Sequence, residues 1–359
     1  MAEYSNFDDK VIEVLPMVAP GTDLYEGLEN ILRARTGALI VLGDSEEILS
    51  LCDGGFRIDC EMRPTALYEL AKMDGAIVLS RDAKRILLAN TQLIPNPLIP
   101  SLETGTRHRT AQRVAVQTGE LVISISQRRN VITLYKGSSK YVMHDVSVIL
   151  AKANQALQTL EKYKSVLGEV LANLTALEFE DLVTAVDVAT AIQRAQMVFR
   201  IANEIEKYIC ELGAEGRLVN MQLEELMVDI EDEGLLVIRD YKSTEEKRQP
   251  EEVWKLLSKW SSEDLLDLNL ITRSLGHGGS MNALETLLTP RGYRTLTKIP
   301  RLPMPVIENL VETFESLPQI LDASIEELDA VEGIGEVRAR AIKEGLRRLR
   351  EQALIDQHI

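Results

Sequence analysis

The stretch Asp74-Gly75-Ala76-Ile77-Val78-Leu79-Ser80 is a short apolar run introduced by a carboxylate and a glycine. An unbroken aliphatic run between turn formers indicates a strand buried on both faces. The same character recurs at residues 37–43, 121–126 and 131–135, and helical spacing occupies residues 24–35, 64–72 and 110–118. This alternation predicts an α/β layer fold, with Arg128-Arg129-Asn130 as the turn of a hairpin.

Beyond the last of these strands the pattern becomes helical. Residues 146–213 follow one long helical period, and further helices are expected at 221–237 and 251–275, closed by Gly276-His277-Gly278-Gly279-Ser280. A chain of 359 residues is too long for one ordinary core. We therefore expect three domains: an α/β domain at residues 1–147, an all-α linker or spine at 148–290, and a third domain at 291–359.

The third domain contains residues 328–342, whose helix, Gly-x-Gly turn and second helix resemble a helix-hairpin-helix motif. Glycines let such a turn approach DNA, and free amides at the start of the second helix bind a phosphate without reading sequence. The candidate DNA-binding residues are Gly333, Ile334, Gly335, Arg338, Arg340 and Lys343. The alternative is an ordinary turn with a solvated basic face. An upstream copy has Ile299-Pro300-Arg301-Leu302-Pro303 in place of the glycine turn, so a packing role is expected there.

Composition limits the classes of function. A net charge of -16 argues against general affinity for nucleic acid or anionic membranes, so any DNA contact must be local. The chain has no apolar run near the roughly 18 residues of a membrane span, and its start lacks a signal-peptide pattern. The three cysteines form no CxxC pair, which argues against a disulfide framework or a zinc finger. We expect a cytoplasmic protein without a membrane partner.

A second motif, Gly105-Thr106-Arg107-His108-Arg109-Thr110-Ala111, follows the first by about thirty residues. Two arginines around a histidine offer forked donors for phosphate oxygens, and a carboxylate beside a glycine suits a divalent metal or a sugar hydroxyl. Together they predict chemistry on a nucleoside triphosphate. Taken alone, the basic run fits a solvated turn as well as it fits a phosphate site. Asp74 alone fits a turn former as well as it fits a ligand of a metal or sugar hydroxyl.

The pair Asp74-Gly75-Ala76 and Arg107-His108-Arg109-Thr110-Ala111 resembles the two signatures of diadenylate cyclases. With a helical spine and a terminal helix-hairpin-helix in that order, the whole chain resembles the bacterial DNA integrity scanning family. The resemblance implies a mixed sheet and the condensation of two ATP into cyclic di-AMP with release of two diphosphates. It also implies Mg²⁺ or Mn²⁺ and a homo-oligomer with facing sites, with an octamer as the expected form. The implied partner is branched, Holliday-junction-like DNA at the nucleoid, whose binding would modulate cyclase activity in a DNA-integrity checkpoint.

By position in the two signatures, the resemblance implies these catalytic residues: Asp74, Gly75, Ala76, Arg107, His108 and Arg109. Asp74 would lie near the 3′-hydroxyl and the metal, Gly75 against the ribose, and Leu93, by itself a core residue, beside adenine. The implied triphosphate contacts are Thr106, Arg107, His108, Arg109 and Thr110, with Ser126, Arg128 and Arg129 on the facing hairpin. His108 is alternatively a metal ligand. The chain departs from the usual pattern at Gln112, where the family commonly has Glu.

Two other functions stay open from the residues alone. Lys72-Met73-Asp74-Gly75 also matches the Lys-x-Asp-Gly core of covalent nucleotidyltransferases such as DNA ligases, with Lys72 as the nucleophile. The match weakens after the glycine, because Ala76 runs straight into the buried strand. The other possibility is a non-catalytic scaffold that senses ATP while bound to DNA.

Overall fold

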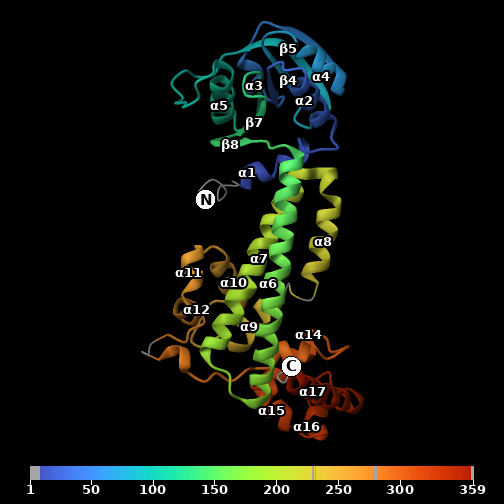
Figure 1. Ribbon diagram of the computed structural model, residues 1–359, viewed down its shortest axis with the longest axis vertical. Helices are drawn as coiled ribbons and strands as arrows, with labels where there is room; N and C mark the ends of the chain where they lie inside the picture. The colour runs from blue at the N-terminus through green and yellow to red at the C-terminus, as the bar shows by residue number, and fades with distance from the viewer. Residues whose placement is uncertain (1–8, 229, 231, 279–281, 357–359) are drawn as a thin grey trace. The chain divides into compact units, whose positions relative to one another are not determined.

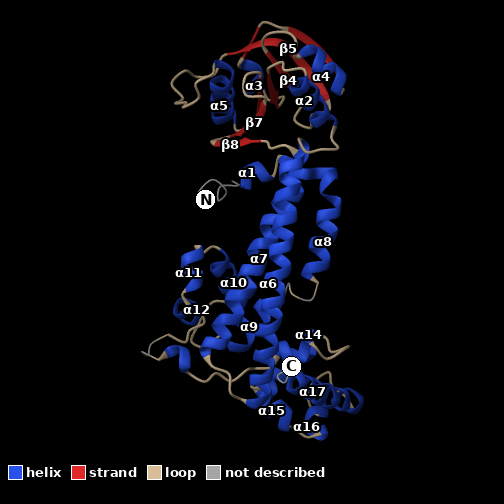
Figure 2. Cartoon of the chain, viewed as in Figure 1, coloured by secondary structure: helices blue, strands red, loops and turns tan. Residues whose placement is uncertain are grey.

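The computed structural model describes residues 9–228, 230, 232–278 and 282–356. They form two compact units: unit 1 is Met1–Gln155 with Ile205–Met221, and unit 2 is Ala156–Glu204 with Gln222–Ile359. All named strands belong to unit 1, whereas unit 2 is built from helices (Figures 1 and 2). In the described part of the chain, no helix combines the length and apolar character that spanning a membrane requires.

One sheet organises unit 1. Its strands are β1 (Ala38–Leu42), β2 (Cys52–Asp53), β3 (Phe56–Glu61), β4 (Ala76–Leu79), β5 (Arg85–Leu93), β6 (Leu121–Ser126), β7 (Val131–Lys136) and β8 (Ser139–Val142). Their order is β2-β5-β4-β1-β6-β7-β8, and β3 also pairs with β5. The β1–β4 pair is parallel and the other named pairs are antiparallel. The sheet is therefore mixed, as predicted.

Both faces of this sheet are covered, which explains why its central strands are apolar at every position. Along β1, Ile40 and Leu42 join one hydrophobic core while Leu39 and Val41 join another. The first core also contains residues of α2 (Asp23–Arg33) and α4 (Pro64–Leu70). The second contains residues of α3 (Glu46–Ser50) and α5 (Thr106–Thr118). Unit 1 also contains α1 (Asp9–Ile12) and η1 (Leu15–Met17).

The long helical period is divided into two helices, α6 (Val146–Glu180) and α7 (Ala185–Leu212). The break follows from Asp181, whose φ of 56° ends α6, and from Asp187, whose carboxylate accepts the amide of Thr184 at 3.0 Å and so caps the next helix. Residues 213–216 then form η2 (Gly213–Gly216). The single helix predicted over 146–213 was therefore wrong at this point.

The other predicted spine helices are also divided. The prediction over 221–237 becomes α8 (Arg217–Met227) and α9 (Glu233–Tyr241). The prediction over 251–275 becomes α10 (Pro250–Ser258), α11 (Ser262–Leu266) and α12 (Leu268–Ser274), because Ser261 and Asp267 each cap a new helix. Part of the predicted glycine loop, Gly279 and Ser280, lies outside the described residues; η3 (Ala283–Glu285) follows it.

The end of the chain forms five helices around one core. They are α13 (Tyr293–Thr297), α14 (Met304–Phe314), α15 (Leu317–Asp322), α16 (Ile325–Asp329) and α17 (Glu336–Asp356). Leu296, Leu310, Leu328 and Ile342 are among the buried residues that join these helices. The predicted helix-hairpin-helix corresponds to α16, the glycine turn and α17.

Candidate active site

Gly75 occupies a position that only glycine fits. Its φ is 94°, and an added Cβ would lie 2.8 Å from the carbonyl carbon of Asn90 and 2.9 Å from the carbonyl oxygen of Thr91. Both obstacles are backbone atoms of β5, so neither gives way easily. The glycine thus lets the chain enter β4 against its neighbour, and it leaves Asp74 exposed directly before the strand.

Several predicted site residues lie in one row across neighbouring strands. The parallel register Ile40↔Ile77, continued towards the amino ends, brings Gly37 level with Asp74. The antiparallel register Ala38↔Ile125 brings Ser126 level with Gly37. On the other side, Ala76 of β4 pairs with Thr91 of β5, two residues before Leu93 at the end of that strand. This end of the sheet therefore gathers Leu93, Asp74 and Ser126, although the Leu93 side chain belongs to the core.

Helix α5 brings its first turn to the same end of the sheet. An added Cβ at Gly37 would lie 1.9 Å from Nη1 of Arg107, so this guanidinium fills the space beside the row. Gly105 is the N-cap and makes no side-chain capping bond. The first amides of α5 and the Arg107 fork consequently form a cationic surface suited to phosphate.

The turn between β6 and β7 adds two exposed arginines to this end. The amide of Asn130 donates to the Ser126 carbonyl at 2.9 Å, and the amide of Arg129 donates to Ser126 Oγ at 3.2 Å. Asn130 has a φ of 52°, which its side chain tolerates better than most. The hairpin predicted around Arg128 is confirmed, and it exposes both arginine side chains.

His108 faces inward from α5 and heads a chain of hydrogen bonds. Its Nδ1 lies 3.1 Å from the hydroxyl of Tyr135, which donates to Oε1 of Glu103 at 3.0 Å. Lys140 Nζ donates to the same carboxylate oxygen at 2.5 Å. Burial lowers the pKa of His108 and raises that of Tyr135 well above its ordinary value. His108 Nε2 is buried and has no partner among the described residues.

The remaining residues of the motif support the loop before α5. Arg109 is exposed and donates from Nε to the Glu103 carbonyl at 3.3 Å. Gln112, which stands where the family pattern has Glu, accepts a hydrogen bond from Ser101 Oγ at 2.5 Å. Thr106 is exposed and Thr110 half-buried. Gln112 therefore braces the loop in this structure.

At the other end of the chain, the glycine turn presents backbone to solvent. Gly333 has a φ of 85°, and an added Cβ at Gly335 would meet nothing within 4 Å. Ile334 is only 7% exposed and packs into the core, so its side chain is not presented to solvent. Arg338 and Arg340 are exposed, and they contact the Gly333 carbonyl and Glu336. Lys343 instead donates to the Leu321 carbonyl at 2.7 Å.

The upstream copy has the shape of a hairpin without its phosphate donors. Arg301 has a φ of 63°, matching the left-handed Gly333 in the second copy. Ile299 is buried in the core and Leu302 packs against it. Pro303 stands before α14 and has no amide hydrogen to offer a phosphate. The packing role expected for this copy agrees with these contacts.

Comparison with known proteins covers nearly the whole chain. Family models match at residues 25–140 (DisA bacterial checkpoint controller nucleotide-binding), 143–284 (DisA bacterial checkpoint controller linker region) and 316–345 (helix-hairpin-helix motif). DNA integrity scanning protein DisA of Carboxydothermus hydrogenoformans is 62% identical over 96% of this chain and 98% of that protein. The chain belongs to the DisA family. The DisA protein of Symbiobacterium thermophilum is 61% identical over 97% of this chain and 98% of its own length.

The family assignment settles the class of activity. As a DisA family member, the chain is a diadenylate cyclase that carries a DNA-binding helix-hairpin-helix motif. Among solved structures, DacA from Staphylococcus aureus aligns with 37% of this chain and 86% of that chain, at 19% identity and a TM-score of 0.28. A likeness that weak supports no argument.

The ligase alternative is not favoured, and the surroundings of Lys72 agree. Its ammonium lies 2.6 Å from Oε1 of Glu69 and 4.4 Å from the ring centroid of Tyr68. The hydrogen bond to Glu69 raises the pKa of Lys72, which disfavours the neutral amine that a nucleophile needs. Lys72 is thus an exposed lysine paired at the end of a helix. The ATP-sensing scaffold is likewise not favoured, because the cyclase family is shown.

Sequence reasoning missed four residues that shape this site: Gly37, Glu103, Tyr135 and Lys140. The sequence places Gly37 at a strand boundary, and nothing in the spacing links it to Arg107. Tyr135 is the last residue of a predicted apolar strand. The hydroxyl of Tyr135 at the end of a buried strand was the signal available in the sequence, because a buried tyrosine usually has a hydrogen-bond partner.

Proposed function

We propose that two copies of this chain make cyclic di-AMP together, each holding one ATP at the sheet end described above. The row of Leu93, Asp74, Gly37 and Ser126, with the Arg107 guanidinium over Gly37, supports this proposal. It places a carboxylate beside a cationic surface of about the extent that a nucleotide needs. Adenine would lie towards Leu93, the ribose at Gly75 and the phosphates at the start of α5.

The chemistry requires two ATP molecules that face each other. The 3′-hydroxyl oxygen of each ATP attacks the α-phosphorus of the other, and the bond from that phosphorus to the diphosphate breaks. Each transfer releases the hydroxyl proton and one diphosphate, and two transfers close the ring. The contribution of Arg107, Arg109 and the α5 amides would be alignment and neutralisation of phosphate charge. Asp74 would orient the attacking hydroxyl.

Mg²⁺ or Mn²⁺ fits the donors that the chain supplies here. His108 Nε2 is buried and finds no partner among the residues that the structure describes, and Asp74 offers an exposed carboxylate. Among the described residues there is no cluster of three or more His, Cys, Asp or Glu that would enclose a cation. A site with few protein ligands, completed by phosphate oxygens and water, is typical of Mg²⁺ with nucleotides. A bound cation would neutralise the triphosphate further.

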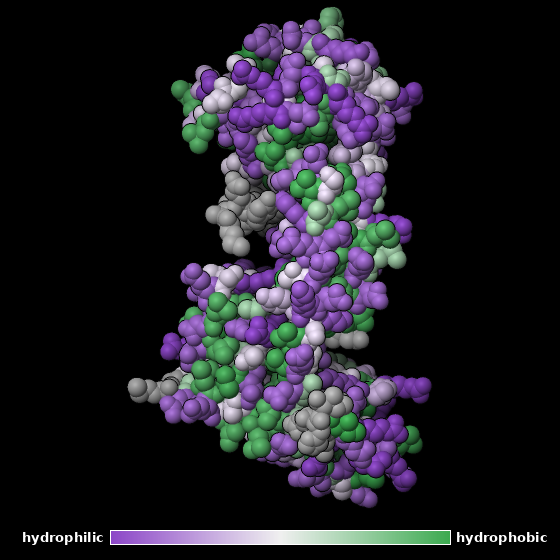
Figure 3. Space-filling view, in the orientation of Figure 1, coloured by the Kyte–Doolittle hydropathy of each residue, from purple (hydrophilic) through white to green (hydrophobic). Residues whose placement is uncertain are grey.

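The second ATP requires a second copy of the chain, and the loop before α5 favours one. Leu98 and Leu102 are 86% and 99% exposed on this loop, beside the cationic surface. Figure 3 shows hydrophobic atoms at the protruding loop next to α5. Apolar side chains in this position favour burial against another subunit. We expect an even-numbered homo-oligomer, and an octamer by analogy with the family.

The glycine turn would carry DNA binding and, through it, control of the reaction. Exposed Gly335 and Arg338 fit contact with phosphate rather than with base edges, so a DNA shape is the expected target. We propose branched, Holliday-junction-like DNA, bound in the cytoplasm at the nucleoid, and a change in cyclase rate on binding as a DNA-integrity checkpoint. Titration of a four-way junction into the reaction tests this. An unchanged rate with the junction bound would contradict it.

The product from ATP tests the cyclase proposal. Pure protein with ATP and Mg²⁺ or Mn²⁺ is expected to yield one cyclic di-AMP and two diphosphates for every two ATP consumed, measured by liquid chromatography and mass spectrometry. Adenylate on a lysine, removed by Lys72→Ala, would support the ligase instead. ATP binding without consumption would support the scaffold.

A further inference from the structure

The phenol of Tyr135 lies between two groups of the candidate site and is almost completely buried, at 1% exposed. It is 3.1 Å from His108 Nδ1 on one side and 3.0 Å from Glu103 Oε1 on the other. Lys140 donates to the same carboxylate oxygen. The three side chains that support His108 come from the loop before α5 and from β7 and β8, so the chain of contacts ties the first turn of α5 to the sheet.

Counting hydrogens fixes the direction of each bond. A phenol has one hydrogen and donates it once. Burial opposes ionisation of Glu103, but the hydrogen bonds from Lys140 and Tyr135 outweigh it and lower the pKa of this carboxyl. An ionised carboxylate only accepts, so the phenol hydrogen points to Glu103. The phenol oxygen then accepts from His108, and Nδ1 must carry a hydrogen.

The hydrogen on Nδ1 determines the state of the other ring nitrogen of His108, Nε2. In a neutral imidazole with a hydrogen on Nδ1, Nε2 has no hydrogen and carries a lone pair that can accept a hydrogen bond or bind a cation. This atom is buried and unpartnered among the described residues, a costly arrangement for an acceptor unless a ligand uses it. A neutral imidazole nitrogen whose partner nitrogen is held by a hydrogen-bond acceptor is the usual arrangement for a metal-binding histidine.

We propose that Tyr135 and Glu103 are positioning residues that hold His108 in the Nδ1–H tautomer, so that Nε2 is available to the divalent cation that accompanies ATP. This inference rests on the proposed nucleotide site, and it assigns a function to a glutamate and a tyrosine outside both sequence motifs. Lys140 supports the arrangement by keeping Glu103 an acceptor.

Glu103→Gln is a sharp test because it keeps the size of the side chain and adds amide hydrogens, while it removes the charge that pairs with Lys140. A glutamine amide at this position can donate to the phenol oxygen. The phenol hydrogen then turns to His108 Nδ1, and the ring hydrogen moves to Nε2, where it blocks a cation. Tyr135→Phe removes the constraint altogether. Tyr141→Phe, on the adjacent strand β8, is the matched control.

The first readout is the tautomer itself. The protein has four histidines, so ¹⁵N-histidine NMR of the full chain, with His108→Asn to assign the signal, reports which ring nitrogen carries hydrogen. Nδ1–H is expected for His108 in the wild type and in Tyr141→Phe, and Nε2–H in Glu103→Gln. An Nε2–H ring in the wild type would overturn the proposal, whether or not the variants fold.

The second readout is Mn²⁺ binding, followed by the free-ion electron paramagnetic resonance signal in the presence of a non-hydrolysable ATP analogue. Glu103→Gln and Tyr135→Phe are expected to weaken Mn²⁺ binding about 10-fold or more, the usual effect of losing such a supporting group. Affinity unchanged in both folded variants would overturn the proposal. Failure of the cyclase proposal is separate, since it would appear as absent product with the predicted tautomer intact.

Discussion

The guanidinium of Arg107 lies in the space that a side chain at Gly37 would fill, with Nη1 only 1.9 Å from the position of an added Cβ. The two residues are 70 positions apart in the sequence, as 107 minus 37 shows, and only Arg107 lies in one of the two sequence motifs. Gly37 thus shapes the cationic surface at the start of α5 although it has no side chain. Its lack of a Cβ is what admits the arginine.

Gly37→Ala is expected to displace Arg107 and weaken ATP binding by about 10-fold or more, the effect of losing a hydrogen bond to a charged group. The obstacle is the far end of a flexible side chain, so the fold should survive. Isothermal titration with an ATP analogue measures the change. Gly168→Ala, whose added Cβ meets nothing within 4 Å, is the control. Equal affinities for Gly37→Ala and wild type would remove Arg107 from the site.

Asp74→Asn is expected to keep ATP binding and lose turnover by about 100-fold or more, because an amide neither orients the attacking hydroxyl nor holds a cation as a carboxylate does. Rates of cyclic di-AMP formation and analogue affinities separate the two effects. Asp44→Asn changes an exposed aspartate beyond the other end of β1 and should leave both unchanged. Parallel loss of affinity and rate in Asp74→Asn would mean that Asp74 serves binding alone.

In unit 2, Arg294 and Glu178 form a fully buried ion pair of 2.6 Å. Arg294→Met would leave the Glu178 charge unpaired, at a cost of about 3–5 kcal/mol in the free energy of unfolding. Urea denaturation measures it. Arg348→Met, at an exposed pair, should cost less than about 1 kcal/mol. Similar unfolding costs for Arg294→Met and Arg348→Met would contradict this expectation.

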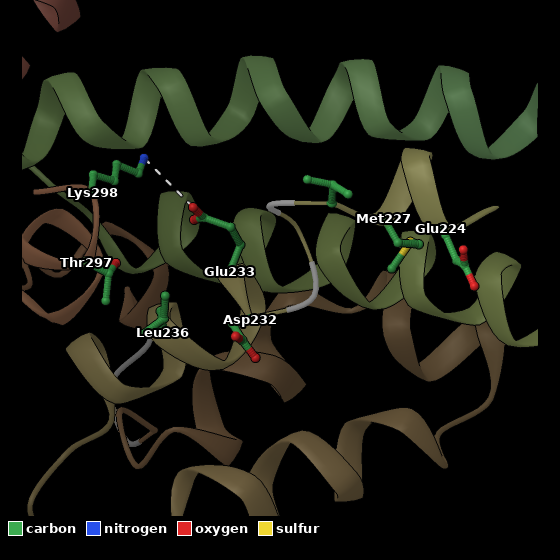
Figure 4. A pocket seen from close by; sticks show the side chains of 8 residues that line it. Glu224, Met227, Asp232, Glu233, Leu236, Thr297 and Lys298 are labelled. Carbon is green, nitrogen blue, oxygen red and sulfur yellow. Dashed lines mark ion pairs between the residues drawn. The ribbon is translucent and has the colours of Figure 1, made fainter. Parts of the chain in front are cut away.

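Figure 4 shows Glu233 and Lys298, which form a 3.9 Å ion pair that lines a cavity of about 690 Å³. Glu233 also lies 3.7 Å from Arg294.

Asp240 gives unit 2 a pH dependence of definite sign. It accepts the amides of Gly292, Tyr293 and Arg294, yet burial and then Glu178 raise its pKa from 3.8 to about 7. Because the folded state holds the proton more tightly, the stabilisation from this group is complete below about pH 4 and is lost as the pH rises through 7. Urea denaturation across this range should show a flatter pH profile for Asp240→Asn, even if that variant is less stable throughout. An identical slope would refute the assignment.

Arg338→Gln is expected to weaken binding of branched DNA and to reduce the slope of log affinity against log salt by about 1, as loss of a phosphate contact does. Fluorescence anisotropy at several salt concentrations measures both. Arg347→Gln lies further along α17, where Arg347 is paired with Glu344 and Glu351, and should change little. A slope that stays constant in Arg338→Gln would place the DNA elsewhere.

Strands buried on both faces were predictable from sequence, whereas β5 was not. Runs such as Ile77-Val78-Leu79 carry an unmistakable signal, because a central strand needs apolar residues at every position. β5 contains Asn90, Thr91 and Gln92, whose polarity resembles a loop, and the positive φ of Asn90 interrupts its register. Its place in the sheet follows from tertiary pairing rather than from its own composition.

The two motifs of the candidate site were visible in the sequence, but the contacts that orient them were not. Glu103, His108 and Tyr135 meet only because α5 packs on β7, and no periodicity links a loop, a helix and a strand in this way. The break between α6 and α7 at Asp181 was not predictable from the hydrophobic period. Apolar residues keep helical spacing on both sides of Asp181, so the period alone predicted one helix.

The most direct test of the central claim is the rate of cyclic di-AMP formation per subunit, measured over a range of protein concentrations together with the oligomeric state by mass photometry. We predict that the rate per subunit falls in proportion to the fraction of paired subunits as the protein is diluted. A monomer that forms cyclic di-AMP at a constant rate per subunit would contradict it.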